Sequence, residues 1–81
     1  PNFIKPENVV VYKSQDAIVV NSKDTAINAV SIYDSVGRKL FEKTNLNTTN
    51  VNFSNINANN QILLVKVTLT DNKTVVRKIL F

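Results

Sequence analysis

The chain has 81 residues, of which ten are Lys or Arg and six are Asp or Glu, so its formal net charge is +4. An apolar fraction of 43% at this length indicates one small folded domain rather than a disordered chain. The sequence has no cysteine and no histidine, which excludes disulfides, thiolate metal sites and catalysis by histidine. No apolar run approaches the roughly 20 residues of a membrane-spanning helix, so no membrane insertion is predicted.

Basic residues are spread along the chain rather than gathered in one segment. The longest runs of adjacent basic residues are the pairs Arg38-Lys39 and Arg77-Lys78. A nucleic-acid-binding domain usually concentrates its basic side chains in a patch or stripe. The distribution therefore favours a solvated basic surface and predicts no nucleic-acid partner.

The chain opens with a lead-in and then alternates strands with polar turns. Residues 1–7 are predicted to be a linker from an upstream domain, because Pro6 cannot donate a strand hydrogen bond and the chain begins without methionine. Residues 8–81 are predicted to be a single domain. Within it, β-branched and aromatic residues predict strands at residues 8–13, 17–21, 26–34, 38–43, 51–53, 61–70 and 74–80.

The central hairpin is the best-defined local feature of the sequence. Val30 and Ile32 alternate with polar residues, as the side chains of a half-buried strand do. Asp34 can bond the backbone at the start of a turn, and Gly37, the only glycine, can adopt positive φ. Leu40 resumes the apolar pattern on the return strand. The segment is therefore predicted to be strand, tight turn and strand.

The longest predicted strand, 61–70, has one fully apolar face. The predicted core side chains on this face are Leu63, Val65, Val67 and Leu69. Asp71 and Asn72 are predicted to close a two-residue hairpin, because asparagine tolerates positive φ better than most residues. The last strand then runs over residues 74–80.

About seven short antiparallel strands without an amphipathic helix predict an all-β sandwich. Its carboxylates lie mostly at predicted turns, at Glu7, Asp16, Asp24, Asp34, Glu42 and Asp71. They lack the regular spacing of a calcium-binding loop, and the serines and threonines have no histidine to activate them. We therefore expect no catalytic residues, metal or cofactor.

Three segments carry a resemblance to a known family. Residues 30–40, Val-Ser-Ile-Tyr-Asp-Ser-Val-Gly-Arg-Lys-Leu, resemble the "V-x-I-Y-D-x-x-G-R-x-V/L" segment of the type A C-terminal sorting domain of the type IX secretion system of Bacteroidetes. Residues 62–67 resemble its "V-Y-I-V-K-V" strand, with Leu63 in place of the tyrosine, and residues 74–80 resemble its closing "T-V-T-K-K-I-L" segment. The blocks follow the family's order.

The resemblance implies an immunoglobulin-like β-sandwich that follows a cargo protein and is not an enzyme. Such a domain folds in the periplasm, is bound by the type IX secretion machinery and is removed by a sorting peptidase. Its cargo is then released or held at the cell surface. The residues expected to be recognised lie on the last two strands, at Lys66, Arg77, Lys78, Ile79, Leu80 and Phe81.

An edge position for the last strand would allow recognition by strand addition, because the backbone groups of an edge strand are unpaired. The alternative function is an accessory immunoglobulin-like adhesion or carbohydrate-binding module of a secreted protein. An exposed aromatic platform formed by Tyr12 and Tyr33 would favour that alternative.

Overall fold

All seven predicted strands form in a computed structural model of the protein, which describes residues 9–58 and 60–81. They are β1 (Val9–Ser14), β2 (Ala17–Ser22), β3 (Ile27–Tyr33), β4 (Lys39–Lys43), β5 (Asn50–Phe53), β6 (Ile62–Leu69) and β7 (Thr74–Leu80). Observed strand ends lie within one residue of the predicted ends wherever both are described. The predicted lead-in, residues 1–7, and the predicted first strand residue, Asn8, lie outside the described residues.

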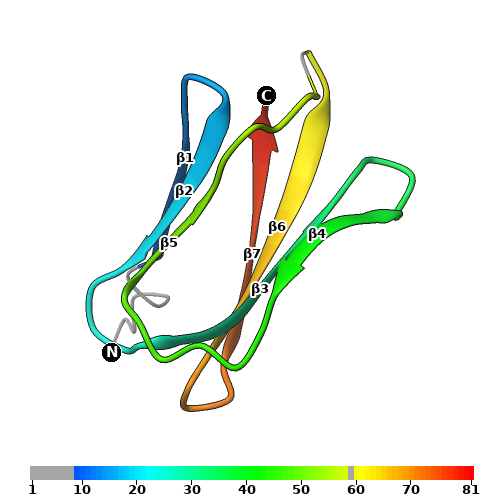
Figure 1. The fold of residues 1–81 in the computed structure, drawn as a ribbon. Helices are drawn as coiled ribbons and strands as arrows, with labels where there is room; N and C mark the ends of the chain where they lie inside the picture. Colours follow the sequence, from blue (N-terminus) through cyan, green and yellow to red (C-terminus); the bar gives the residue numbers. More distant parts are fainter. Residues whose placement is uncertain (1–8, 59) are drawn as a thin grey trace, which may run out of the picture.

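The strands form two antiparallel sheets that face each other, with the orders β1-β2-β5 and β4-β3-β6-β7 (Figure 1). This arrangement confirms the all-β, immunoglobulin-like sandwich. The fourth strand pairs with the third, whereas in the constant-type immunoglobulin domain it pairs with the fifth. β7 forms one edge of the four-stranded sheet, and β6 is its hydrogen-bonded neighbour.

The connection from β4 to β5 carries the chain from one sheet to the other. Within this connection, the Thr48 carbonyl accepts a 2.7 Å hydrogen bond from the Ile27 N–H. The Thr49 carbonyl accepts a 2.9 Å bond from the Ser22 N–H at the end of β2. The crossing segment is therefore bonded to a strand of each sheet, which fixes where β5 begins.

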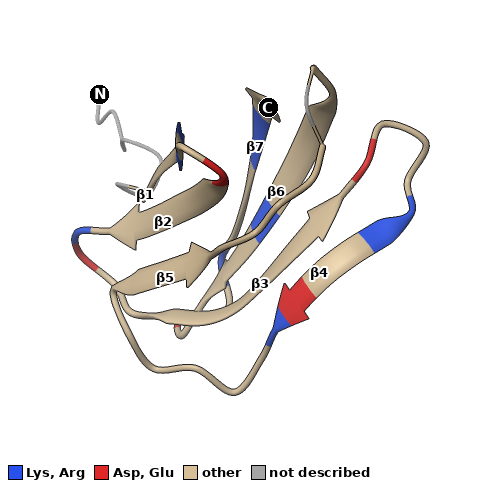
Figure 2. Cartoon of the chain, turned by 45° about the horizontal axis from the view of Figure 1, so that its top comes forward, with Lys and Arg blue, Asp and Glu red and all other residues tan. Residues whose placement is uncertain are grey.

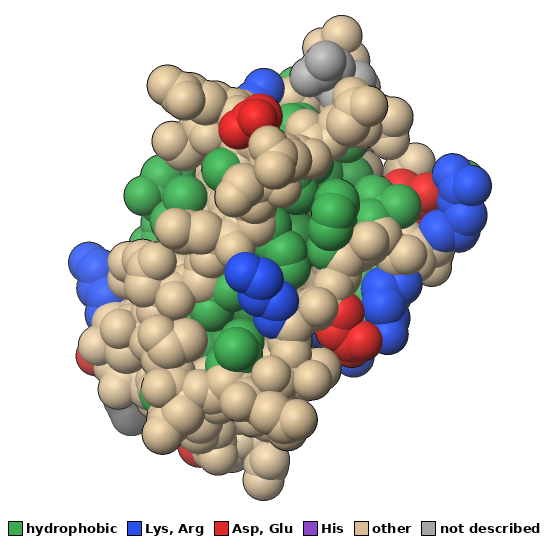
Figure 3. Space-filling view, viewed as in Figure 1, with side chains coloured by type: hydrophobic (Ala, Val, Ile, Leu, Met, Phe, Trp, Pro, Cys, Tyr) green, Lys and Arg blue, Asp and Glu red, His purple; other side chains and the backbone are tan. Residues whose placement is uncertain are grey.

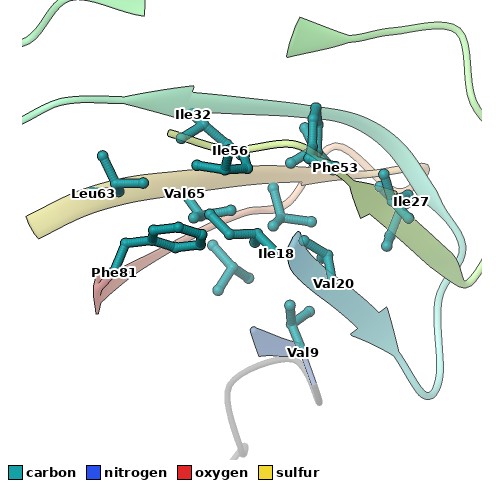
Figure 4. Packing of buried hydrophobic residues seen from close by; sticks show 14 of the residues in the cluster. Val9, Ile18, Val20, Ile27, Ile32, Phe53, Ile56, Leu63, Val65 and Phe81 are labelled. Atoms are coloured by element: carbon teal, nitrogen blue, oxygen red, sulfur yellow. The ribbon is translucent and has the colours of Figure 1, made fainter. Parts of the chain in front are cut away.

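The core fills the space between the two sheets (Figure 4). Its described members are Val9, Ile18, Val20, Ile27, Val30, Ile32, Val51, Phe53, Ile56, Ala58, Leu63, Val65, Val67, Leu69, Val75 and Phe81. The four β6 side chains predicted to face the core are all 0% exposed, which confirms that face. Period-two alternation is clearest on β5 and β6, where buried residues alternate with more exposed ones.

The β3–β4 turn is a three-residue hairpin loop. The Gly37 N–H donates to the Asp34 carbonyl at 3.0 Å, and the Asp34 N–H donates to the Arg38 carbonyl at 3.0 Å. Gly37 has a φ of 89°, so the loop combines a tight turn with a left-handed residue. This geometry confirms the predicted turn and the reason for its glycine.

The β6–β7 turn repeats this hydrogen-bond pattern with asparagine in place of glycine. The Asn72 N–H donates to the Leu69 carbonyl at 3.0 Å, and the Leu69 N–H donates to the Lys73 carbonyl at 2.8 Å. Asn72 has a φ of 72°. The predicted two-residue loop at Asp71 and Asn72 is wrong in length, because Thr70 also belongs to the loop. A left-handed third residue makes the longer loop compatible with the strand twist.

Two lysines join the sheets at opposite sides of the sandwich. Lys13 of β1 donates from Nζ to the Phe81 carbonyl at 2.8 Å and lies 4.5 Å from the centre of the Phe81 ring. Lys43 of β4 donates to the Asn52 carbonyl at 2.6 Å and lies 4.9 Å from the centre of the Phe53 ring. Figure 3 shows a basic side chain lying across apolar side chains between the sheets. Each lysine therefore donates a hydrogen bond to a backbone carbonyl and makes a cation–π contact with an aromatic ring.

Candidate docking surface on the last two strands

The register of β6 and β7 assigns each predicted recognition residue to one face of the sheet. Lys66 pairs with Val76, and Lys78 pairs with Leu64. Both pairs alternate with the buried β6 side chains, so they lie on the outer face. Arg77 pairs with the buried Val65 and therefore lies on the core side of the sheet.

We call Ile62, Lys66, Val76, Lys78 and Leu80 the outer patch. All five side chains are exposed, and the largest apolar exposure is that of Leu80 at 67%. Figure 2 shows basic residues on β6 and β7 and no acidic residue on either strand. The patch thus combines apolar side chains with two positive charges, a composition suited to binding another macromolecule.

The structure brings Lys66, Lys78 and Leu80 together and separates the other predicted recognition residues from them. Arg77 and Ile79 point to the core side of β7, where each is half-buried. Phe81 is only 5% exposed and packs in the core, with its ring beneath Lys13. Phe81 therefore contributes to the fold rather than to the exposed surface.

Two exposed members of the outer patch were missed by the sequence reasoning. Val76 is 54% exposed and Ile62 is 43% exposed. The exposure of Val76 could have been predicted from strand alternation, because Val76 lies two residues from Lys78 and therefore on the same face. The pairing of Ile62 with Leu80 depends on the register between β6 and β7. Only the hairpin closure sets that register.

Along β7, residues whose N–H and C=O groups bond to β6 alternate with residues whose N–H and C=O groups point away from β6. The Leu69–Lys73 bond at one end and the 2.8 Å bond from the Phe81 N–H to the Gln61 carbonyl at the other fix this alternation. Val75, Arg77 and Ile79 are accordingly the residues that bond to β6. Val76, Lys78 and Leu80 then direct their N–H and C=O groups outward. The Arg77 Nη1 donates to the outward Val76 carbonyl at 3.3 Å.

Asp34 stabilises the β3–β4 turn through both carboxylate oxygens. Oδ1 accepts from the N–H groups of Val36 at 3.1 Å and Arg38 at 2.9 Å. Oδ2 accepts from the Arg38 Nε at 2.8 Å, which is also an ion pair. Donation by the Arg38 backbone N–H is the main reason that the pKa of Asp34 lies below its ordinary value of 3.8, although partial burial opposes the shift.

The lowered pKa of Asp34 predicts a loss of stability in acid. Because the unfolded chain binds this proton more readily, the stabilisation is complete above pH 3.8 and is lost as pH falls through the lower folded pKa. We expect Asp34→Asn to reduce the acid-dependent part of the unfolding free energy. The measurement is urea denaturation across this pH range. Equal slopes for Asp34→Asn and the unmodified chain would contradict the prediction.

The described carboxylates form no site for a metal ion. Across residues 9–58 and 60–81, no group of three or more Asp, Glu, His or Cys side chains could hold a metal. Within the same residues there is no helix long and apolar enough to cross a membrane.

The two tyrosines do not form a common platform. Tyr12 is 48% exposed and pairs with Val19, on the outer face of the sheet that contains β1. Tyr33 pairs with Leu64, on the outer face of the other sheet. Because the two outer faces point in opposite directions, one flat ligand cannot contact both rings.

Comparison with known proteins gives a family but no activity. No curated protein matches the chain. The family model DUF8694, described as a domain of unknown function, matches residues 1–81. The match covers the full length of the sequence, and the chain therefore belongs to the DUF8694 family.

Proposed function

We propose that this domain is a non-enzymatic sorting signal that directs an attached cargo protein across the outer membrane through the type IX secretion system. The observation that carries the proposal is the position of the three resembling segments. Residues 30–40 lie on β3, β4 and their turn, residues 62–67 lie on β6, and residues 74–80 form β7. These four strands are the whole of one sheet, in the order β4-β3-β6-β7.

The other sheet supports the core in this proposal and contains none of the resembling segments. β1, β2 and β5 bury Ile18, Val20 and Phe53 against the four-stranded sheet. The resembling segments therefore share a continuous outer surface and include both edge strands of that sheet, β4 and β7. A recognition signal requires such a surface, whereas a catalytic function would require converging reactive groups.

The proposed mechanism is strand addition at β7. A component of the type IX machinery pairs with the outward backbone groups of Val76, Lys78 and Leu80 and contacts the outer patch. The cargo precedes the domain, the domain is in the periplasm during transit, and a sorting peptidase separates it from cargo that is secreted or held at the cell surface. These partners and locations follow the resemblance.

The test is a secretion assay in a bacterium with an active type IX system. The full 81-residue chain is fused after a periplasmic fluorescent protein, alongside Val76→Pro and Val76→Thr variants. Proline removes the outward N–H of residue 76, which makes no bond to β6, and proline is tolerated on edge strands. Threonine keeps that N–H and is the matched control.

We expect the original fusion and the Val76→Thr fusion to reach the medium or cell surface, and the Val76→Pro fusion to stay in the periplasm. Protease resistance of the Val76→Pro domain checks that it is folded. Retention of the original fusion in the periplasm would overturn the sorting proposal. Export of all three fusions would leave sorting intact and overturn recognition by strand addition at β7.

A further inference from the structure

The four edge strands of the sandwich differ in how their charged side chains are used. On β4, the Lys39 Nζ pairs with the Glu42 Oε1 at 3.2 Å, and Lys43 bonds to the Asn52 carbonyl. That second bond occupies a carbonyl of β5, the edge of the other sheet. On β1, Lys13 bonds to the Phe81 carbonyl. The charged side chains of β1 and β4 are thus bonded within the molecule, and β5 has no charged side chain.

β7 is different because its two charges have the same sign and no acidic partner among residues 9–58 and 60–81. Arg77 and Lys78 lie at the middle of the strand, and neither forms an ion pair with any described carboxylate. Within the described residues, the side chain of Arg77 bonds only to the carbonyl of Val76, at 3.3 Å. An added strand would therefore meet two positive charges that have no acidic partner within the described residues, one on each face of the sheet.

We propose that β7 binds an extended partner segment that presents two adjacent acidic residues flanked on both sides by apolar residues. The inference deepens the proposed function and rests on it in taking β7 as the recognised strand. The acidic pair supplies charge complementarity, and the backbone of the segment supplies the hydrogen bonds of a fifth strand.

The order of residue types follows from pairing across neighbouring strands. Side chains directly opposite each other share a face, and opposite charges stabilise such a pair. An added residue opposite Lys78 lies on the outer face, and one opposite Arg77 lies on the core side. Acidic residues at both positions are therefore adjacent in the added strand.

The flanking positions require apolar residues. On the outer face, Val76 and Leu80 lie two residues away from Lys78, at 54% and 67% exposure. On the core side, Val75 and Ile79 flank Arg77 in the same way. The complement of residues 75–80 is thus apolar, apolar, acidic, acidic, apolar, apolar. Since this order is the same in both directions, it holds for parallel and antiparallel addition.

The test uses the isolated 81-residue chain and a short capped peptide with the central order Val-Ile-Glu-Glu-Ile-Val. The matched control peptide is Val-Ile-Lys-Lys-Ile-Val, which keeps the apolar residues and reverses the charge. Binding is measured by titration with NMR detection of the backbone amides. A variant of the protein with the double substitution Arg77→Glu and Lys78→Glu is titrated in the same way, and its amide spectrum checks that it is folded.

We expect the acidic peptide to bind about tenfold or more tightly than the basic peptide, because two attractive pairs become repulsive. Binding should slow hydrogen exchange at the amides of Val76, Lys78 and Leu80 and should weaken with added salt. The double variant should reverse the preference and bind the basic peptide more tightly.

Three results would overturn the inference: no binding of the acidic peptide, equal binding of both peptides, or protection at another edge such as β4. None of these results involves secretion. A domain that is exported but ignores the acidic peptide would remove this inference and leave the sorting proposal standing. A domain that binds the peptide but is not exported would overturn the sorting proposal and leave the binding preference of β7 standing.

Discussion

Replacing Leu63 with alanine is expected to lower the free energy of unfolding by about 3 kcal/mol. Leu63 is 0% exposed and is among the largest fully buried side chains of the core. Alanine would lose the transfer energy of the removed carbons and leave a cavity that the two sheets fill only in part. For a domain of this size, such a loss is a large share of the total stability.

The neighbouring residue provides the control for Leu63→Ala. Ile62 is on the same strand but 43% exposed, on the opposite face of the sheet. We expect Ile62→Ala to change the free energy of unfolding by less than about 1 kcal/mol, since the side chain is already largely in water. Urea denaturation of both variants measures the difference. Similar losses for the two variants would mean that the core is not on the Leu63 face.

Replacing Phe81 with alanine is the second large expected effect, again about 3 kcal/mol. The ring is 5% exposed and lies among the core side chains near Val65 and Ile18 (Figure 4). Its replacement also removes the contact with the Lys13 ammonium, 4.5 Å from the ring centre. Thermal or urea unfolding measures the effect.

Leu80→Ala is the matched control, because Leu80 is 67% exposed at the adjacent position. We expect it to change stability by less than about 0.5 kcal/mol. Equal losses for Leu80→Ala and Phe81→Ala would contradict the assignment of Phe81 to the core.

The position of Phe81 changes how recognition by β7 should be tested. Deleting Ile79, Leu80 and Phe81 would remove exposed surface and core at the same time, because Phe81 is buried. A loss of secretion after such a deletion would then have two explanations. A substitution confined to an outward-facing position of β7, such as Val76→Pro, separates recognition from folding.

Local sequence patterns are sufficient to predict the strands and the central turn. Strand positions follow from local alternation, which sets which face of each strand is apolar, as Leu63 and Val65 illustrate. Gly37 marked the turn because a left-handed residue is needed there and glycine adopts that conformation without strain. The Asp34 carboxylate acts on residues two and four positions away, so its role is also local.

The edge positions of the strands and the exposure of the recognition residues, in contrast, depend on how the two sheets assemble. Alternation alone does not distinguish a fourth strand beside β3 from one beside β5, because both positions bury one face. Phe81 bonds through its carbonyl to Lys13 of the opposite sheet, which is 68 residues earlier in the sequence. Arg77 and Lys78 lie on opposite faces of the sheet, and an added strand can pair with both of them only because β7 is an edge strand. The edge strands, the contacts of Lys13 and Lys43 between the sheets, and the outer patch arise from non-local contacts, which local sequence patterns do not encode.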